Sequence, residues 1–222
     1  MKKHKPNFGI AAMALLTAFL LWTVAVCRID VQPIGPEGSS VGFGTWNRLF
    51  HNLTGVHLGL YTATDWLSLV PVACSLGFAL LGLFQWLKRK SLLKVDASLL
   101  VLGGFYLVVL AAYLFFERCV INHRPVLIDG VLEASYPSST TLLVLCLMPT
   151  AGMQLRSRIR AGKLRGGMTL AIAAFTAFMV VGRLISGVHW LTDIIGGVLL
   201  SGGLVSLYQW AISFCKKSFR RK

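Results

Sequence analysis

The chain has 222 residues, of which 55% are hydrophobic and only 14% are charged, and its formal net charge is +14. Such a large apolar fraction with so few charges excludes an ordinary soluble globular protein. Uncharged segments of about 20 residues can cross the hydrocarbon core of a bilayer, and the sequence has six of similar length: 8–27, 66–87, 97–116, 138–155, 166–182 and 194–214. We therefore predict an all-α fold: one integral membrane bundle of six transmembrane helices, forming a single domain over residues 1–222.

The basic residues are concentrated in four clusters, which hold 17 of the 22 lysines and arginines and lie at residues 2–5, 88–94, 156–165 and 216–222. Six spans would place all four clusters on one side of the membrane, which the positive-inside rule makes cytoplasmic. We therefore expect both termini in the cytoplasm and seven of the eight acidic residues on the other side. The positive charge then reflects topology and contact with anionic lipid, and it does not indicate a nucleic-acid site.

The first apolar segment follows a basic N-terminus, as the apolar part of a secretory signal peptide does. Its 20 residues exceed the usual length of that part, and no A-x-A cleavage site follows. We interpret it as an uncleaved membrane anchor. The longest polar segment comes next, at residues 28–65, and within it residues 45–60 are expected to form a helix at the membrane surface.

A second polar segment, residues 117–137, separates the third and fourth predicted spans. Its three basic residues could act on a substrate: Arg118, His123 and Arg124. Three hydroxyl residues could cap the fourth helix, whose free amides would form an anion site: Ser138, Ser139 and Thr140. Each of these residues taken alone also has an ordinary interpretation, as an interfacial arginine or histidine or as a simple helix cap.

A third group joins the last two predicted spans, where Arg183, His189 and Asp193 lie within a dozen residues. A helix would place His189 and Asp193 on one face, because they are four residues apart. A carboxylate that holds one imidazole nitrogen leaves the other free to attack or to accept a proton. Arg183 offers a planar fork of donors suited to phosphate. Ionisable groups so close to a bilayer are functional candidates.

Metal and nucleotide sites are not indicated by the remaining residues. The histidines are scattered, no Cys/His pair has the spacing of zinc ligands, and no glycine-rich phosphate loop occurs. We therefore expect chemistry on phosphate, if it takes place here, to use side chains without a metal or cofactor.

Together these segments resemble the three-part signature of the type 2 phosphatidic acid phosphatase (PAP2) family. The resemblance rests on Arg124-Pro125, on Pro137-Ser138, and on Arg183 followed by five residues, His189, three residues and Asp193. It covers residues 117–197 closely, and the layout of six spans extends it over the whole chain. The resemblance implies hydrolysis of lipid phosphates and diphosphates through a phosphohistidine, without a metal.

The resemblance also implies roles for individual residues. His189 would be the nucleophile and Asp193 its orienting partner, while Arg124, Arg183 and Ser138 would hold the phosphate. Substrate lipid and membrane lipids are the expected partners. Isoprenoid, glycerolipid and sphingoid tails would all suit an apolar groove, and the sequence does not fix an oligomeric state.

The sequence departs from the family pattern in each of its three motifs. Glu117 stands where the family has a lysine, and Gly182 stands where it has a serine. The second motif ends in Ser139-Thr140, whereas the family has Gly-His, and that histidine is the family's general acid. A positioned general acid contributes about 10² to 10⁴ in rate. Its loss should be severe for a basic alkoxide leaving group and mild for a phosphate leaving group, so we expect an active enzyme that prefers lipid diphosphates such as polyprenyl diphosphate.

Two other functions also fit the same residues. A non-catalytic membrane protein would bind lipid phosphates with the arginines and form no covalent intermediate. A phosphotransferase would pass the phosphoryl group from His189 to a lipid acceptor instead of water. His123, next to Arg124, is the one other histidine close enough in sequence to replace the missing acid.

Overall fold

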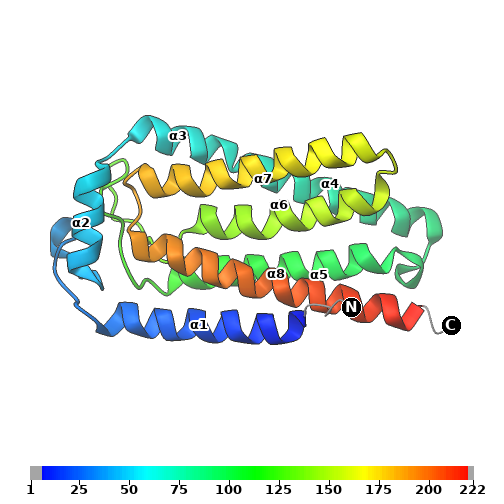
Figure 1. Cartoon of the computed structure of the whole chain (residues 1–222), viewed down its shortest axis with the longest axis horizontal. Helices are drawn as coiled ribbons and strands as arrows, with labels where there is room; N and C mark the ends of the chain where they lie inside the picture. The colour runs from blue at the N-terminus through cyan, green and yellow to red at the C-terminus, as the bar shows by residue number, and fades with distance from the viewer. Residues whose placement is uncertain (1–6, 220–222) are drawn as a thin grey trace, which may run out of the picture.

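The computed structural model describes residues 7–219, with side chains up to Cys215, and this part of the chain is helical throughout except for its connections. Six long helices lie side by side in one elongated bundle (Figure 1): α1 (Phe8–Arg28), α4 (Leu69–Arg89), α5 (Ala97–Arg118), α6 (Ser139–Arg158), α7 (Gly162–Ile185) and α8 (Leu191–Phe219). The connections contain α2 (Gly44–Thr54), α3 (Leu58–Leu67) and two single 3₁₀ turns, Pro36–Gly38 and Leu92–Lys94.

The six predicted spans correspond to these six long helices, and five of the six are long and apolar enough to cross a membrane. The exception is α6, which has 20 residues but includes Pro149 and Gln154. It packs against α4, α5, α7 and α8, so its side chains meet other helices instead of lipid and need not be uniformly apolar. The all-helical bundle is confirmed, whereas composition supports five membrane spans and not six.

The polar segment before α4 forms two helices where one was expected. Gly55 has φ 68° and ends α2, so the helix expected over residues 45–60 is wrong in extent. α3 follows and packs against α7, and α4 begins two residues after α3 ends. Pro71 has no N–H to donate to the carbonyl of Leu67, which explains why the helix breaks there. The second predicted span therefore begins at Leu69.

The outer surface of the bundle is strongly apolar. Large side chains that are about two-thirds exposed occur on four different helices: Leu21, Leu80, Leu107 and Leu170. Soluble monomers rarely expose apolar area on this scale, whereas lipid tails solvate it without cost. The chain is therefore built as an integral membrane protein.

The two ends of the bundle differ in character. The basic clusters at residues 88–94 and 156–165 share one end, on the right in Figure 1, as the charge pattern predicted. The other end carries α2, the α5–α6 connection and the α7–α8 turn. The predicted clusters at residues 2–5 and 216–222 lie outside the described side chains, and the cytoplasmic location of the basic end stays a prediction.

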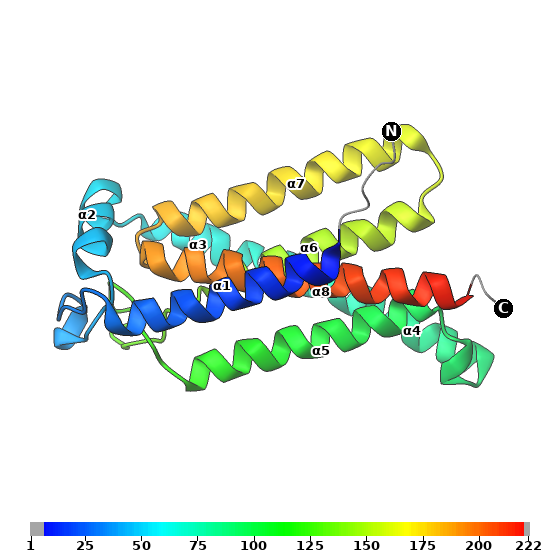
Figure 2. The same cartoon turned by 60° about the horizontal axis from the view of Figure 1, so that its bottom comes forward.

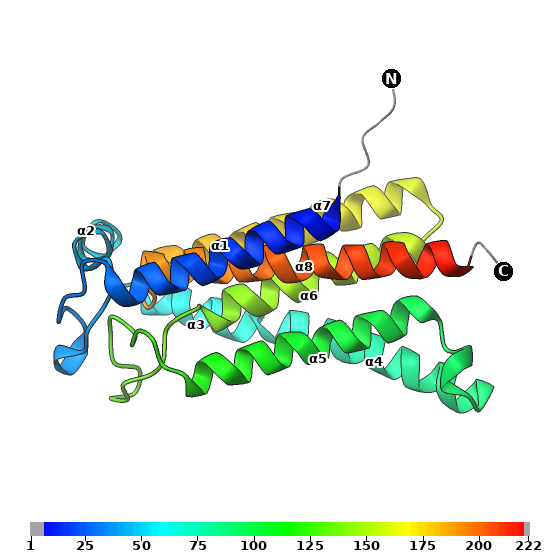
Figure 3. The same ribbon diagram turned by 90° about the horizontal axis from the view of Figure 1, so that it is seen from below.

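The first and last helices lie against one another, as Figures 2 and 3 both show. A Cβ atom at Gly203 would lie 2.7 Å from the side chain of Leu16, so Leu16 would have to shift to admit a larger residue. A Cβ at Gly196 would similarly lie 2.7 Å from Tyr136. Tyr136 is buried just before the start of α6, and this contact fixes the start of α6 against the start of α8.

Candidate active site

The polar groups singled out by the sequence meet at the end of the bundle that carries α2. Five of them come from the α5–α6 connection, the end of α7, the α7–α8 turn and the start of α8, and all are buried: Arg124, Ser138, Arg183, His189 and Asp193. Arg183 is 1% exposed and Asp193 is completely buried. Buried charges are costly unless they are paired or hydrogen-bonded, so the contacts of each group show what the cluster is built to hold.

Asp193 is fixed by the way α8 begins. It is the third residue of that helix, and its Oδ2 accepts the backbone N–H of Trp190 at 2.9 Å. This is the returning half of a capping box, in which a side chain at the third position holds the residue before the helix. His189 lies in the turn outside α8, so the expectation that a shared helix face joins His189 and Asp193 is wrong; the capping turn brings them together.

A serine connects the imidazole to the carboxylate. The Nδ1 atom of His189 is 3.8 Å from Oδ2 of Asp193, which is too far for a hydrogen bond. Ser135 Oγ lies between them, donating to Asp193 Oδ2 at 2.5 Å and lying 3.0 Å from His189 Nδ1. Because the hydroxyl has one proton and gives it to the carboxylate, it accepts from Nδ1–H, and Nε2 keeps its lone pair.

The supporting residues come from a short hairpin in the α5–α6 connection. His123 and Ala134 form an isolated β-bridge, Ser135 N–H donates to the carbonyl of Asn122, and Asn122 Nδ2 donates to Asp193 Oδ1 at 3.2 Å. Side chains alternate along extended chain, so Asn122 and Arg124 share one face and His123 takes the other. The sequence interpretation missed Asn122 and Ser135, because neither residue type is distinctive in a loop.

The two arginines lie around one aromatic ring. The guanidinium carbon of Arg183 is 4.8 Å from the ring centroid of Tyr61, and that of Arg124 is 5.5 Å from the same centroid. Such cation–π contacts help to offset the repulsion between two buried cations. Tyr61 lies on α3, and the sequence gave no signal that this helix reaches the site.

Each guanidinium forms an ion pair with one carboxylate through one of its nitrogens. Arg183 Nη2 donates to Asp65 Oδ1 at 3.2 Å, and Arg124 Nε lies 3.0 Å from Glu133 Oε2 at an angle outside hydrogen-bond geometry. The Nε and Nη1 atoms of both arginines are buried without a hydrogen-bond partner. Unpaired donors on two neighbouring cations indicate a site for an anion.

His189 is uncharged in this setting. Burial, and then the positive charges of Arg124 and Arg183, lower the pKa of His189 to about 4, although Asp193 acts in the opposite direction. Its Nε2 atom is buried and has no hydrogen-bond partner. The cluster therefore combines a neutral imidazole with a free lone pair and two arginines with free donors.

The remaining predicted residues have structural contacts. Ser138 caps α6, because its Oγ accepts the Thr141 N–H at 3.5 Å, and its own N–H donates to the carbonyl of Asp193. Thr140 Oγ1 accepts from Arg183 Nη2 at 2.6 Å. Ser139 lines a small hollow beside α5 together with Glu117 and Ser135.

Two further candidates stay apart from the cluster. Arg118 is exposed at the end of α5, and within the described part of the chain its side chain joins no member of the cluster by a hydrogen bond or ion pair. His123 contributes its carbonyl, which accepts the Trp190 Nε1–H at 2.8 Å. The structure thus brings together the arginines, His189 and Asp193, but it does not bring Arg118 to them.

The glycine that departs from the family pattern has a packing role. A Cβ atom at Gly182 would lie 2.8 Å from Cγ2 of Thr64 on α3. Glycine at this position lets α3 approach the end of α7, and that approach carries Tyr61 and Asp65 onto Arg183. Asp65 itself could have been noticed, because it is a carboxylate directly before a predicted span.

No protein-family model and no curated protein sequence matches the chain. Its structure is similar to the crystal structure of a transmembrane PAP2-type phosphatidylglycerolphosphate phosphatase from Bacillus subtilis, with a TM-score of 0.55 and 19% sequence identity. The match covers 93% of this chain and 96% of that chain. The chain has the PAP2 fold. The resemblance drawn from three short motifs is therefore confirmed at the level of the fold, and the PAP2 fold extends over nearly the whole chain.

The carboxylate of Asp65 should compete with any phosphate that binds within this PAP2 fold. Asp65→Asn is expected to lower KM for a phosphorylated lipid up to about fivefold with little change in kcat, because a half-exposed ion pair is worth roughly 0.2–1 kcal/mol. Steady-state kinetics would measure this, with Asp30→Asn as a control: Asp30 lies in the α1–α2 loop and bonds Gln32 and Thr45. An unchanged or higher KM in Asp65→Asn would contradict the competition.

Proposed function

We propose that this protein is a membrane lipid phosphatase that transfers a phosphoryl group from a lipid phosphate, or preferably a lipid diphosphate, to His189 and then to water. The observation that carries the proposal is the lone pair of His189 Nε2, buried without a partner and near two arginines that also have unpaired donors. A site for simple anion binding would not require a neutral imidazole oriented by Ser135, which is itself hydrogen-bonded to a carboxylate.

In the first step, Nε2 of His189 attacks phosphorus, the P–Nε2 bond forms and the bond from phosphorus to the leaving oxygen breaks. Arg124 and Arg183 hold the non-bridging oxygens and stabilise their charge in the transition state. The ring becomes positively charged, and its Nδ1–H remains hydrogen-bonded to Ser135, which is held by Asp193. In the second step, water attacks phosphorus, the P–Nε2 bond breaks, and inorganic phosphate leaves with the protons of the water, so that the neutral imidazole is restored.

Release of inorganic phosphate from a panel of lipids tests the proposal. The panel would contain isoprenoid, glycerolipid and sphingoid mono- and diphosphates, assayed with EDTA present for the purified protein and for His189→Ala. We expect release by the native protein and none by the variant. Binding without release would favour the non-catalytic lipid-binding protein. Transfer of labelled phosphate to an added lipid alcohol would favour the phosphotransferase.

The pH dependence should reflect the low pKa of His189. Because that pKa is lowered to about 4, the imidazole is neutral above this value, and kcat/KM should lose His189-dependent activity only as the pH falls towards about 4. Rates measured on a lipid diphosphate would show this, after correction for ionisation of the substrate followed by ³¹P NMR. An acid limb near the ordinary histidine value of about 6.5 would contradict the assignment.

Ser135 should act as a positioning residue for His189. Ser135→Ala removes the group between Nδ1 and the carboxylate, so we expect kcat to fall about 10- to 100-fold, as when a hydrogen bond supporting a ligand histidine is lost, with KM nearly unchanged. Ser201→Ala provides the control, because Ser201 is also buried and hydrogen-bonded but contacts Leu142 in the bundle interior. Equal kcat values in the two variants would contradict this role.

A further inference from the structure

A hollow of about 590 Å³ lies between α6 and α7 and extends along them from Arg156 and Thr169 to Val181, two residues before Arg183. Both helices contribute small side chains to its lining. α7 contributes Ala173 and Ala177, one helical turn apart, and α6 contributes Pro149 and Gly152. Small side chains on two neighbouring helices leave an apolar groove that opens at the outer surface of the bundle.

The groove continues into a cationic end. A second hollow of about 460 Å³ shares Arg156, Thr169 and Ala173 with the first and is also lined by Arg165. These two arginines come from the end of α6 and the start of α7. The continuous surface is thus apolar in the membrane region and positively charged at the end of the bundle opposite the candidate active site.

The charge of this pair is uncompensated. Within the described side chains, neither Arg156 nor Arg165 makes an ion pair or donates a side-chain hydrogen bond, and the sequence has no acidic residue between Glu133 and Asp193. Arg158, two residues from Arg156, is used differently: it bonds the carbonyl of Gln154 at 3.0 Å and lies 3.9 Å from Asp96. One arginine of this loop therefore stabilises the fold, while the two that line the groove are free to bind an anion.

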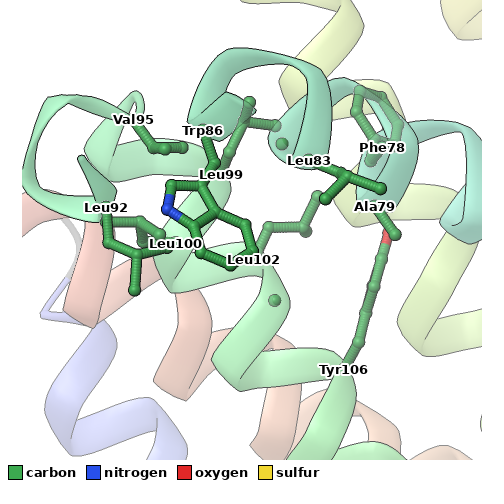
Figure 4. Close-up of a pocket in the computed structure, with 12 residues that line it drawn as sticks. Phe78, Ala79, Leu83, Trp86, Leu92, Val95, Leu99, Leu100, Leu102 and Tyr106 are labelled. Atoms are coloured by element: carbon green, nitrogen blue, oxygen red, sulfur yellow. The ribbon is translucent and has the colours of Figure 1, made fainter. Parts of the chain in front are cut away.

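A similar hollow elsewhere lacks this property. Figure 4 shows a hollow of about 290 Å³ between α4 and α5, lined by side chains such as Leu83, Trp86 and Tyr106. No charged residue lines it. An acyl chain could enter either hollow, but only the α6–α7 groove of these two offers a partner for a negatively charged headgroup.

We propose that the α6–α7 groove binds one anionic phospholipid from the membrane leaflet opposite the active site. One acyl chain lies along Ala173 and Ala177, and the headgroup phosphate lies between Arg156 and Arg165. Paired arginines favour a phosphate oxygen fork, and basic pockets between transmembrane helices are suited to anionic lipid headgroups. The apolar floor selects a lipid over free phosphate. This lipid is a bound component of the bundle and not the substrate, because its headgroup phosphate lies at Arg156 and Arg165, at the opposite end of the bundle from His189.

Native mass spectrometry of the full-length protein in detergent tests the proposal, using titration with dioleoylphosphatidylglycerol and, in parallel, dioleoylphosphatidylcholine. We expect one tightly retained phosphatidylglycerol. The double variant Arg156→Gln/Arg165→Gln should weaken its binding about tenfold or more, since each basic residue near an anionic lipid contributes about 1 kcal/mol. Lys88→Gln/Lys90→Gln is the matched control, because it removes the same charge from the same end without altering the groove.

A second pair of variants tests the apolar part. Ala173→Phe fills the α6–α7 groove with the arginines intact and should also release the lipid, whereas Ala79→Phe fills the α4–α5 hollow and should not. Equal weakening of lipid binding in the arginine-to-glutamine and lysine-to-glutamine variants would show general attraction to surface charge. Full retention in both would show that Arg156 and Arg165 do not hold the lipid. Either result would overturn the proposal. Loss of the lipid in Arg124→Gln instead would place it in the active site, which would also overturn the proposal.

Discussion

Replacing His189 with alanine is expected to remove turnover, with a loss in kcat on the order of 10⁶ by comparison with deletion of the nucleophile in other enzymes that use covalent catalysis. The variant should keep its fold, because the His189 side chain accepts no hydrogen bond at Nε2. The hydrogen bond from Trp190 N–H to Asp193 Oδ2, which caps α8, does not depend on His189. Phosphate release and thermal unfolding would be measured on the same preparation.

His57→Ala is a suitable control for this variant, because His57 is an exposed histidine between α2 and α3 at the same end of the bundle. It should retain native turnover. Full phosphate release by His189→Ala would exclude a phosphohistidine at this position. A similar loss in both variants would indicate that disturbance of this end of the bundle, not removal of the nucleophile, is responsible.

Lipid diphosphates are expected to be cleaved about 10² to 10⁴ times faster than the matching monophosphates, which is the usual contribution of a general acid. Thr140 stands where the PAP2 pattern has its histidine, and its hydroxyl accepts a hydrogen bond from Arg183. A threonine hydroxyl has far too high a pKa to protonate an alkoxide near neutral pH. Phosphate monoester leaving groups need little protonation, so diphosphates should escape the penalty. The ratio of kcat/KM values for the two substrates would measure this.

Two variants sharpen the test of leaving-group dependence. Thr140→His should raise monophosphate turnover more than diphosphate turnover, provided that the start of α6 can seat an imidazole beside Arg183. His123→Ala should change neither rate greatly, because the hairpin places His123 on the face away from Arg124. Comparable native rates on both substrates would show that another group supplies the proton.

The sequence predicted the bundle because two signals in it are strong. Uncharged segments of membrane-spanning length are rare in soluble proteins, so they identify the helices that cross the bilayer. Ionisable residues next to such segments are rare as well, so Arg183, His189 and Asp193 could be selected without a structure. The contact between His189 and Asp193 was predicted for the wrong reason. A four-residue spacing fits a helix face, but here it belongs to a capping turn with Ser135 inserted.

Other features depend on packing that a single sequence does not encode locally. Ser135 reaches Asp193 because the hairpin pairs His123 with Ala134, and a shift of one residue would turn it away. Tyr61 and Asp65 reach the arginines because Gly182 lets α3 approach α7. α6 falls short of the hydropathy of the other long helices because those helices enclose it, so its role in the bundle can be seen only after assembly.

Trapping the covalent intermediate tests the central proposal most directly. A lipid diphosphate labelled with ³²P in its terminal phosphate would be mixed with the protein and quenched within milliseconds, and the label bound to protein would be followed through acid and base treatment. Label that is stable in base, labile in acid, recovered on the peptide containing His189 and missing from His189→Ala is the predicted result. Rapid release of phosphate with no label on the protein at any time would contradict a phosphohistidine mechanism.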